Sequence, residues 1–157
     1  MVDLGCAPGS WSQVACELIG PDGMVIGVDL LETATISGFY FIHGDFTEDV
    51  TLLRLVQAID QKPVDLVVSD MSPNLSGIKN VDQVRLAYLA TLVLDFSTNY
   101  LKSGGTCLIK VFHGSEFDGL MKNMRELFNK VVTIKPHASR SESSEVYLLG
   151  LDKKQLE

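Results

Sequence analysis

The sequence predicts an α/β fold: a mostly parallel sheet with helices on both faces and an antiparallel strand near the carboxyl terminus. Short β-branched, apolar runs alternate along the chain with longer stretches of helical periodicity. Strands that read as unbroken apolar runs are typical of parallel sheets covered on both faces. Near the end of the chain two strand-like runs follow each other without a helix between them, and this predicts the antiparallel strand.

The expected elements are separated by short Gly, Pro or Asp punctuation. Residues 2–4 are expected to be the last residues of the first strand. Residues 153–157 are expected to form a frayed tail. The other strands are expected at residues 24–29, 39–43, 64–70, 106–112, 131–135 and 146–151. The helices are expected at residues 10–19, 49–59, 82–101 and 116–128.

Length and composition indicate one globular domain. The chain has 157 residues, of which 46% are hydrophobic and 21% charged. No apolar run approaches the roughly 20 residues that span a bilayer, and no secretory leader is evident. The chain opens almost directly on a strand end, which favours a fragment of a longer domain. The three cysteines, Cys6, Cys16 and Cys107, are expected to be reduced, and an intracellular compartment fits them best.

The net charge of −7 counts against nucleic-acid binding, because phosphate contacts usually require a basic face. An average says little about a local patch, however. Basic residues gather in the second half of the chain, at Lys102, Lys110, Lys122, Arg125, Lys130, Lys135 and Arg140.

A glycine-rich turn joins the first strand to the first helix, in the segment from Asp3 through Gly5, Ala7, Pro8 and Gly9 to Trp11. Glycine permits positive φ and lets a ligand approach the backbone, while free amides at the helix start face that ligand. The segment is not a phosphate loop, since no Gly-Lys-Ser/Thr follows, and it lacks the G-x-G-x-x-G of dinucleotide binding. A solvated structural turn remains an alternative.

Acidic residues follow three successive strands of the expected sheet. Asp29, Asp45 and Asp70 each come at or near a strand end, and Asp3 lies in the first strand. Ligands of open α/β sheets bind outside the carboxyl ends of the strands, where these acids would converge. Asp29 would meet ribose hydroxyls, and Asp45 an amino group of adenine. The alternative is that each acid caps the helix that follows it.

Lys110 lies in an apolar run that is expected to be buried, and lysine is almost never buried without a partner. Either its amine reaches solvent from the end of the sheet, or a carboxylate holds it. The polar segments 70–74 and 138–145 are either solvated turns or donors to phosphate oxygens near a crevice.

Four motifs together resemble the FtsJ/RrmJ family of RNA 2′-O-methyltransferases. They are residues 3–13, residues 69–74, the strand of Lys110 to Phe112, and Ala138-Ser139-Arg140 leading to residues 143–147, in the family's order. The resemblance covers nearly the whole chain. The wording of the last motif is similar to an alphaproteobacterial and mitochondrial branch that acts on a uridine of large-subunit ribosomal RNA.

The resemblance implies a Rossmann-like, S-adenosylmethionine-dependent methyltransferase fold and a Lys-Asp-Lys-Glu tetrad. It implies that Asp70, Lys110 and Glu145 are catalytic. The family's first lysine lies on a helix ahead of Asp3 that this sequence does not contain. Cofactor contacts are implied for Gly5, Ala7, Pro8, Gly9, Trp11, Asp29, Asp45, Phe46 and Asp70.

The expected reaction methylates a ribose 2′-hydroxyl of ribosomal RNA, free or in the assembled subunit, and yields S-adenosylhomocysteine. No metal, membrane or obligate protein partner is expected, and the compartment is the bacterial cytoplasm or the mitochondrion. The alternatives are methylation of another RNA or a small molecule, and an inactive RNA-binding homologue.

Overall fold

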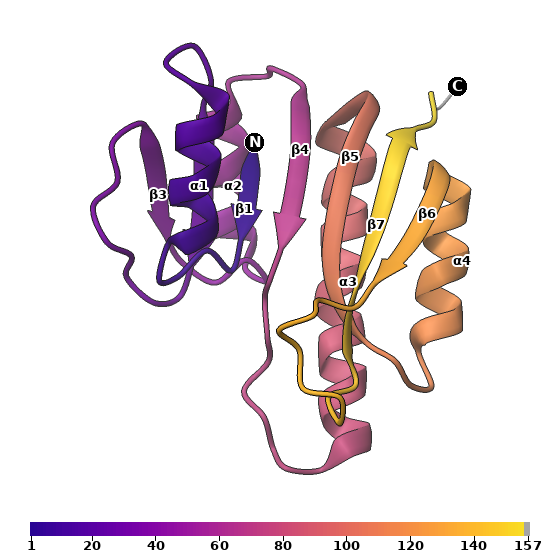
Figure 1. The fold of residues 1–157 in the computed structure, drawn as a ribbon. Coiled ribbons are helices and arrows are strands. Elements are labelled where there is room, and N and C mark those ends of the chain that lie inside the picture. The colour runs from indigo at the N-terminus through magenta and orange to yellow at the C-terminus, as the bar shows by residue number, and fades with distance from the viewer. Residues whose placement is uncertain (156–157) are drawn as a thin grey trace.

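A computed structural model describes residues 1–155 and confirms the predicted sheet (Figure 1). Seven strands form one sheet in the order β3-β2-β1-β4-β5-β7-β6. The first five strands are parallel, and only β7 runs antiparallel to both of its neighbours. The strands are β1 (Val2–Leu4), β2 (Val25–Asp29), β3 (Phe39–His43), β4 (Val64–Ser69), β5 (Leu101–Phe112), β6 (Phe128–Ile134) and β7 (Glu145–Lys153).

The helices cover the two faces of the sheet unequally. One core cluster joins the buried sides of α2, α3 and α4 to the same face of the sheet, whereas α1 packs on the other face near β2 and β3. Within residues 1–155, no helix covers β5, β7 and β6 on the side of α1 (Figure 1). The helices are α1 (Ser10–Ile19), α2 (Asp49–Ile59), α3 (Lys79–Tyr100) and α4 (Phe117–Leu127).

Strand alternation determines which side chains reach this uncovered side. Cys107, Ile109 and Val111 of β5 are buried in the core under α3 and α4. Their neighbours Leu108 and Lys110 therefore point to the opposite face, since successive side chains of a strand alternate. The register places Leu108 and Lys110 beside the partly buried Leu149 and Tyr147 of β7. We call this uncovered side of β5, β7 and β6 the open face.

Three element boundaries differ from the prediction by three residues or more. Helix α3 begins at Lys79 instead of residue 82, and β5 begins at Leu101 instead of residue 106. Residues 102–105 are polar or glycine, so the apolar run that predicts β5 begins only after them. Leu101 nevertheless pairs with Val64, with a shift of register before the next pair. Strand β6 begins at the fully buried Phe128, three residues early, because Phe128 pairs with Lys153.

The prediction of a frayed tail from residue 153 is wrong for Lys153. This lysine is the last residue of β7 and is only 6% exposed. Its amine donates to the carbonyl oxygens of Thr98 at 2.7 Å and Leu101 at 2.6 Å, which satisfies acceptors at the end of α3. Burial lowers the pKa of Lys153. Residues 156 and 157 of the expected tail lie outside the described residues.

Candidate active site

The turn between β1 and α1 depends on two glycines. Gly5 has φ of 78° and Gly9, the N-cap of α1, has φ of 112°, a region that side chains disfavour. A Cβ on Gly5 would lie 2.7 Å from the backbone nitrogen of Met71, which no side-chain rotation can relieve. The peptide bond between Ala7 and Pro8 is cis. The turn therefore brings the bare backbone of β1 against the segment that follows β4.

Asp29 fastens this turn at the end of β2. Its Oδ2 accepts the amide N–H of Ala7 at 2.8 Å, and its Oδ1 accepts that of Leu31 at 2.8 Å. A carboxylate oxygen can accept more than one hydrogen bond, so both oxygens retain capacity for a ligand. The residue predicted to meet ribose hydroxyls thus also shapes the glycine turn.

The three acids predicted at strand ends do line one cleft. This cleft, of about 230 Å³, lies at the carboxyl ends of the parallel strands and contains Asp29, Asp45 and Asp70. Asp45 follows β3 by two residues, and its Oδ1 accepts both the amide and the hydroxyl of Thr47, at 2.8 and 2.7 Å. The remaining lining residues are Gly5, Ala7, Val28, Leu30, Leu31, Gly44, Phe46, Met71, Ser72 and Leu89.

A second hollow, of about 200 Å³, adjoins the cleft on the side of α1. Gly5, Ala7 and Asp70 line both, so the two form one continuous depression around the glycine turn. Pro8 and Trp11 line the second hollow, together with Asp3, Cys6 and Ser10. Gly9 lines neither hollow: it is buried behind the turn, where it caps α1.

Asp3 is the most unusual polar residue of the second hollow. It is 1% exposed, and its Oδ2 accepts the hydroxyl of Ser12 at 2.6 Å. Its Oδ1 is buried and has no hydrogen-bond partner among the described residues. Burial raises the pKa of Asp3 to about 6, assisted by the charges of Asp70 and Asp29 and opposed by the Ser12 hydrogen bond. A buried acceptor without a donor is costly unless a ligand supplies one.

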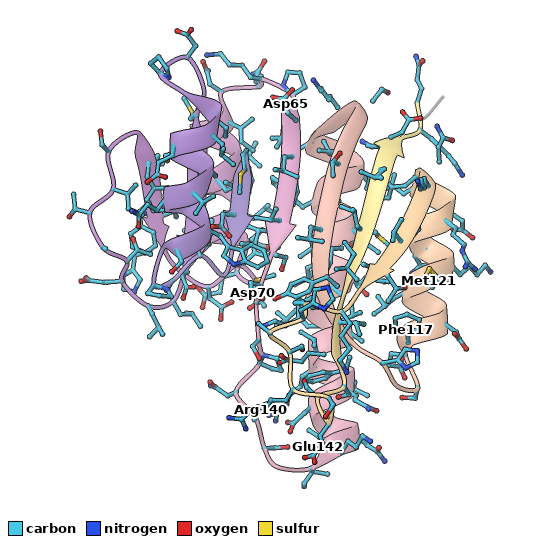
Figure 2. The ribbon with its side chains drawn as sticks, viewed as in Figure 1. Asp65, Asp70, Phe117, Met121, Arg140 and Glu142 are labelled. Carbon is cyan, nitrogen blue, oxygen red and sulfur yellow. The ribbon has the colours of Figure 1, made fainter. Side chains whose placement is uncertain are left out.

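Lys110 is held by a carboxylate, which decides between the two alternatives that the sequence left open. Its Nζ lies 3.0 Å from Asp70 Oδ1, and the Lys110 side chain is 12% exposed. The same oxygen accepts the hydroxyl of Tyr147 at 2.6 Å. Asp70 lies just past the end of β4 (Figure 2). Three strands, β4, β5 and β7, therefore meet through one carboxylate at the edge of the open face.

Tyr147 is the site residue that sequence reasoning missed. Its ring also lies beside that of Trp11, with centroids 5.7 Å apart, and so connects the carboxylate to the second hollow. Burial raises the pKa of Tyr147, and its hydrogen bond to Asp70 raises it further, so the hydroxyl remains a donor. The pairing of Lys110 with Tyr147 across β5 and β7 would have revealed it, had the register been known.

Glu145 is less closely placed. It opens β7, as predicted, opposite Phe112 and two residues before Tyr147, on the same face of the strand. Among the described residues it forms no ion pair with Lys110, whose carboxylate partner is Asp70.

In residues 1–155, no group of three or more His, Cys, Asp and Glu is arranged to hold a metal ion. The helices of the same stretch include none that could cross a membrane.

Comparison with known proteins identifies the family. The model of the FtsJ-like methyltransferases matches residues 1–153. The chain belongs to the FtsJ-like methyltransferase family. A curated relative from Methylobacillus flagellatus, named ribosomal RNA large subunit methyltransferase E, is 56% identical over 154 residues, which are 98% of this chain and 74% of the relative.

Solved structures agree with this FtsJ-like assignment. A protein from Plasmodium falciparum that is described as a ribosomal RNA methyltransferase superposes with a TM-score of 0.85 at 29% identity. That match covers 97% of this chain and 85% of the other. Human methyltransferase-like protein 13, solved with S-adenosylhomocysteine, has a TM-score of 0.63 at 11% identity, covers 96% and 70%, and shows the shared fold alone. The predicted Rossmann-like methyltransferase fold is confirmed.

Proposed function

We propose that this FtsJ-like methyltransferase transfers a methyl group from S-adenosylmethionine to a ribose 2′-hydroxyl of large-subunit ribosomal RNA, most simply that of a uridine. The observation that carries the proposal is the Lys110 amine, fixed 3.0 Å from Asp70 Oδ1 where the two hollows meet. The name of the 56% identical relative supports ribosomal RNA as the substrate class.

The residues around the glycine turn fit S-adenosylmethionine. When bound, this cofactor supplies a methyl group activated by its sulfonium. Asp29 would accept hydrogen bonds from the ribose hydroxyls, and Asp45 one from the adenine amino group, with Phe46 beside it. Pro8, Trp11 and the turn itself would hold the methionine part, and the unpartnered Oδ1 of Asp3 would accept from its ammonium group. Acidic walls suit a ligand whose net charge is positive, since the sulfonium and ammonium groups outweigh its carboxylate.

Lys110 would orient the attacking hydroxyl and take its proton. A ribose hydroxyl is a weak nucleophile, so an amine that is neutral at the moment of attack can remove the proton at the 2′-oxygen. Asp70 opposes this role, because a carboxylate at 3.0 Å stabilises the charged amine. Much of the acceleration would then come from holding the hydroxyl in line, a contribution of orientation.

Asp70 and Tyr147 would keep Lys110 in place. The Asp70 oxygen that binds the amine is itself fixed by the Tyr147 hydroxyl at 2.6 Å. Glu145 lies two residues before Tyr147 on the same face of β7. It would add a second negative charge beside that of Asp70 and position the ribose of the target nucleotide. These assignments extend the predicted catalytic set of Asp70, Lys110 and Glu145 by one aromatic residue.

The test is transfer of labelled methyl from S-adenosylmethionine to purified large ribosomal subunits and to free large-subunit RNA, with the protein extended at its amino terminus. Nuclease digestion and mass spectrometry should locate the label on a ribose 2′-oxygen. Lys110→Ala should reduce transfer at least about 100-fold with unchanged cofactor affinity, since the amine acts on the hydroxyl alone. Lys122→Ala, on the exposed side of α4, is the matched control.

Three outcomes would contradict the proposal. Label on a base would assign a different acceptor atom. Near-normal turnover of Lys110→Ala would remove the proposed role of the amine. Cofactor and RNA binding without any transfer would instead favour an inactive RNA-binding homologue.

We further propose that a helix ahead of Asp3 covers the open face in the complete domain and brings the family's first lysine to the site. Leu108, Leu149 and Val132 form one row of this face and are only partly buried. Across from them, α1 exposes Val14 at 54% and Leu18 at 81%. Curated relatives contain additional length, since the chain spans 74% of the first of them. A chain extended at its amino terminus should bind less of a dye that reports exposed apolar surface, and equal dye binding would contradict the proposal.

A further inference from the structure

The loop between β6 and β7, residues 135–144, forms several internal hydrogen bonds and lies at the carboxyl end of β5. Two turns follow each other: the Ser139 amide donates to the carbonyl of Pro136 at 2.9 Å, and the Ser143 amide to that of Arg140 at 3.0 Å. The Lys135 amine donates to the Ser143 carbonyl at 2.7 Å and closes the base of the loop.

A further bond joins this loop to the strand that carries Lys110. The amide of His113, which directly follows β5, donates to the carbonyl of Ser144 at 2.8 Å. The loop is therefore held at the same edge of the sheet as the catalytic candidates Lys110 and Asp70. Arg140 lies on it beyond the strand ends, past Asp70 in the view of Figure 2.

Arg140 is a free cation at this edge. It is exposed and takes part in none of the ion pairs found among residues 1–155. Lys110 cannot serve in its place, because Asp70 neutralises it at 3.0 Å. The planar guanidinium suits the bidentate binding of a phosphate, which a lysine binds only as a point charge.

The distribution of charge favours one half of the molecule for the RNA strand. Residues 1–69 contain 2 basic and 10 acidic side chains, a net charge of −8, and they form β3, β2, β1 and β4 with α1 and α2. Residues 70–157 contain 11 basic and 10 acidic side chains, a net charge of +1. A phosphate chain is repelled by the first half of the sheet and tolerated by the second.

We infer that Arg140 binds a backbone phosphate beside the target nucleotide, and that the RNA strand lies over the β5-β7-β6 half of the molecule. This inference rests on the proposed function. In this role Arg140 contacts a phosphate and no base, so it does not recognise the RNA sequence. It positions the strand so that one ribose lies at Lys110.

Binding of a 20-nucleotide single-stranded RNA, measured over a series of salt concentrations, tests the inference. Each phosphate contact contributes about 0.7 to the salt slope for single strands, so Arg140→Ala should lower the slope by about that amount and weaken binding about tenfold. Arg140→Lys should retain the slope but bind more weakly than wild type, because it keeps the charge and loses the fork. Lys62→Ala, an exposed lysine in the acidic half, should match wild type.

Two results would overturn the inference. An Arg140→Ala slope and affinity equal to those of wild type would exclude the phosphate contact while leaving the proposed function intact. A wild-type protein that binds neither this RNA nor purified large ribosomal subunits, with cofactor binding normal, would overturn both. Cofactor affinity should be the same in all three variants, since none of the substituted residues lines either hollow.

Discussion

The two halves of the sheet divide the work of the site between them. The half of β3, β2, β1 and β4 is strongly acidic and contains the glycine turn with the carboxylates of both hollows. The half of β5, β7 and β6 is nearly neutral and contributes Lys110, Tyr147 and Glu145. Asp70 stands at the boundary, lining both hollows and binding the amine.

The unequal distribution of charge would allow an acidic protein to act on RNA, as we propose. The whole surplus of negative charge lies in the half that we assign to the cofactor, a cationic ligand. Under the proposed function, the two ligands of one site have opposite charges and approach opposite halves, so the net charge of the whole chain would not indicate the partner. Substitutions in one half should therefore affect the binding or reaction of one ligand and leave that of the other unchanged.

The largest effect is expected for Gly5→Ala in the acidic half. The new Cβ would meet the backbone of Met71, so the turn must move and cofactor affinity should fall at least 100-fold, about 3 kcal/mol. Gly20→Ala is the matched control, because Gly20 also has positive φ, 77°, but no atom within 4 Å of an added Cβ. It should cost only the conformational strain, about 1 kcal/mol of stability. Calorimetric titration with S-adenosylmethionine measures the cofactor affinity of the two variants. An equal loss of affinity in Gly5→Ala and Gly20→Ala would show that the space at Gly5 is unimportant.

A smaller effect, on stability, is expected for Asp3→Asn in the same half. The folded protein holds a proton on Asp3 up to about pH 6, because burial raises the pKa of this carboxyl from its ordinary value of 3.8. Wild-type stability should therefore fall as pH rises from about 4 to about 6 and stay level above, by an amount on the order of 2 to 3 kcal/mol.

Asp3→Asn should remove that slope, as followed by urea unfolding at pH 4.5 and pH 7.5. It should also weaken cofactor binding at neutral pH, where the carboxylate would otherwise accept from the ammonium group. Asp22→Asn, at an exposed position, serves as the control and should do neither. An unchanged slope in Asp3→Asn would place the titrating group elsewhere.

The smallest effect is expected for Tyr147→Phe in the neutral half. Loss of its hydroxyl frees Asp70 Oδ1 from a 2.6 Å hydrogen bond and lets the pair with Lys110 shift. We expect kcat to fall about tenfold, a loss of about 1.4 kcal/mol in transition-state stabilisation, with cofactor affinity unchanged. Tyr40→Phe, on the exposed side of β3, is the control. A fall in cofactor affinity instead of kcat would mean that Tyr147 belongs to the other half of the comparison.

Local patterns in the chain were sufficient to predict most of the fold. Strand and helix periodicity, with the glycine turn, predicted every element and the antiparallel strand, because these depend on residues a few positions apart. The convergence of Asp29, Asp45 and Asp70 was also predictable, since parallel strands end at one edge of a sheet. The start of β5 was not, because glycines and polar residues interrupt its pattern while its pairing with β4 continues.

Only the tertiary structure decided which carboxylate holds Lys110 and that Tyr147 shares it. Asp70 lies 40 residues from Lys110 and 77 from Tyr147, and their meeting depends on the register of three strands, which no local pattern specifies. The same holds for the buried amine of Lys153 and the unpartnered oxygen of Asp3. Polarity along a chain marks a residue as unusual, but its partner is determined by packing.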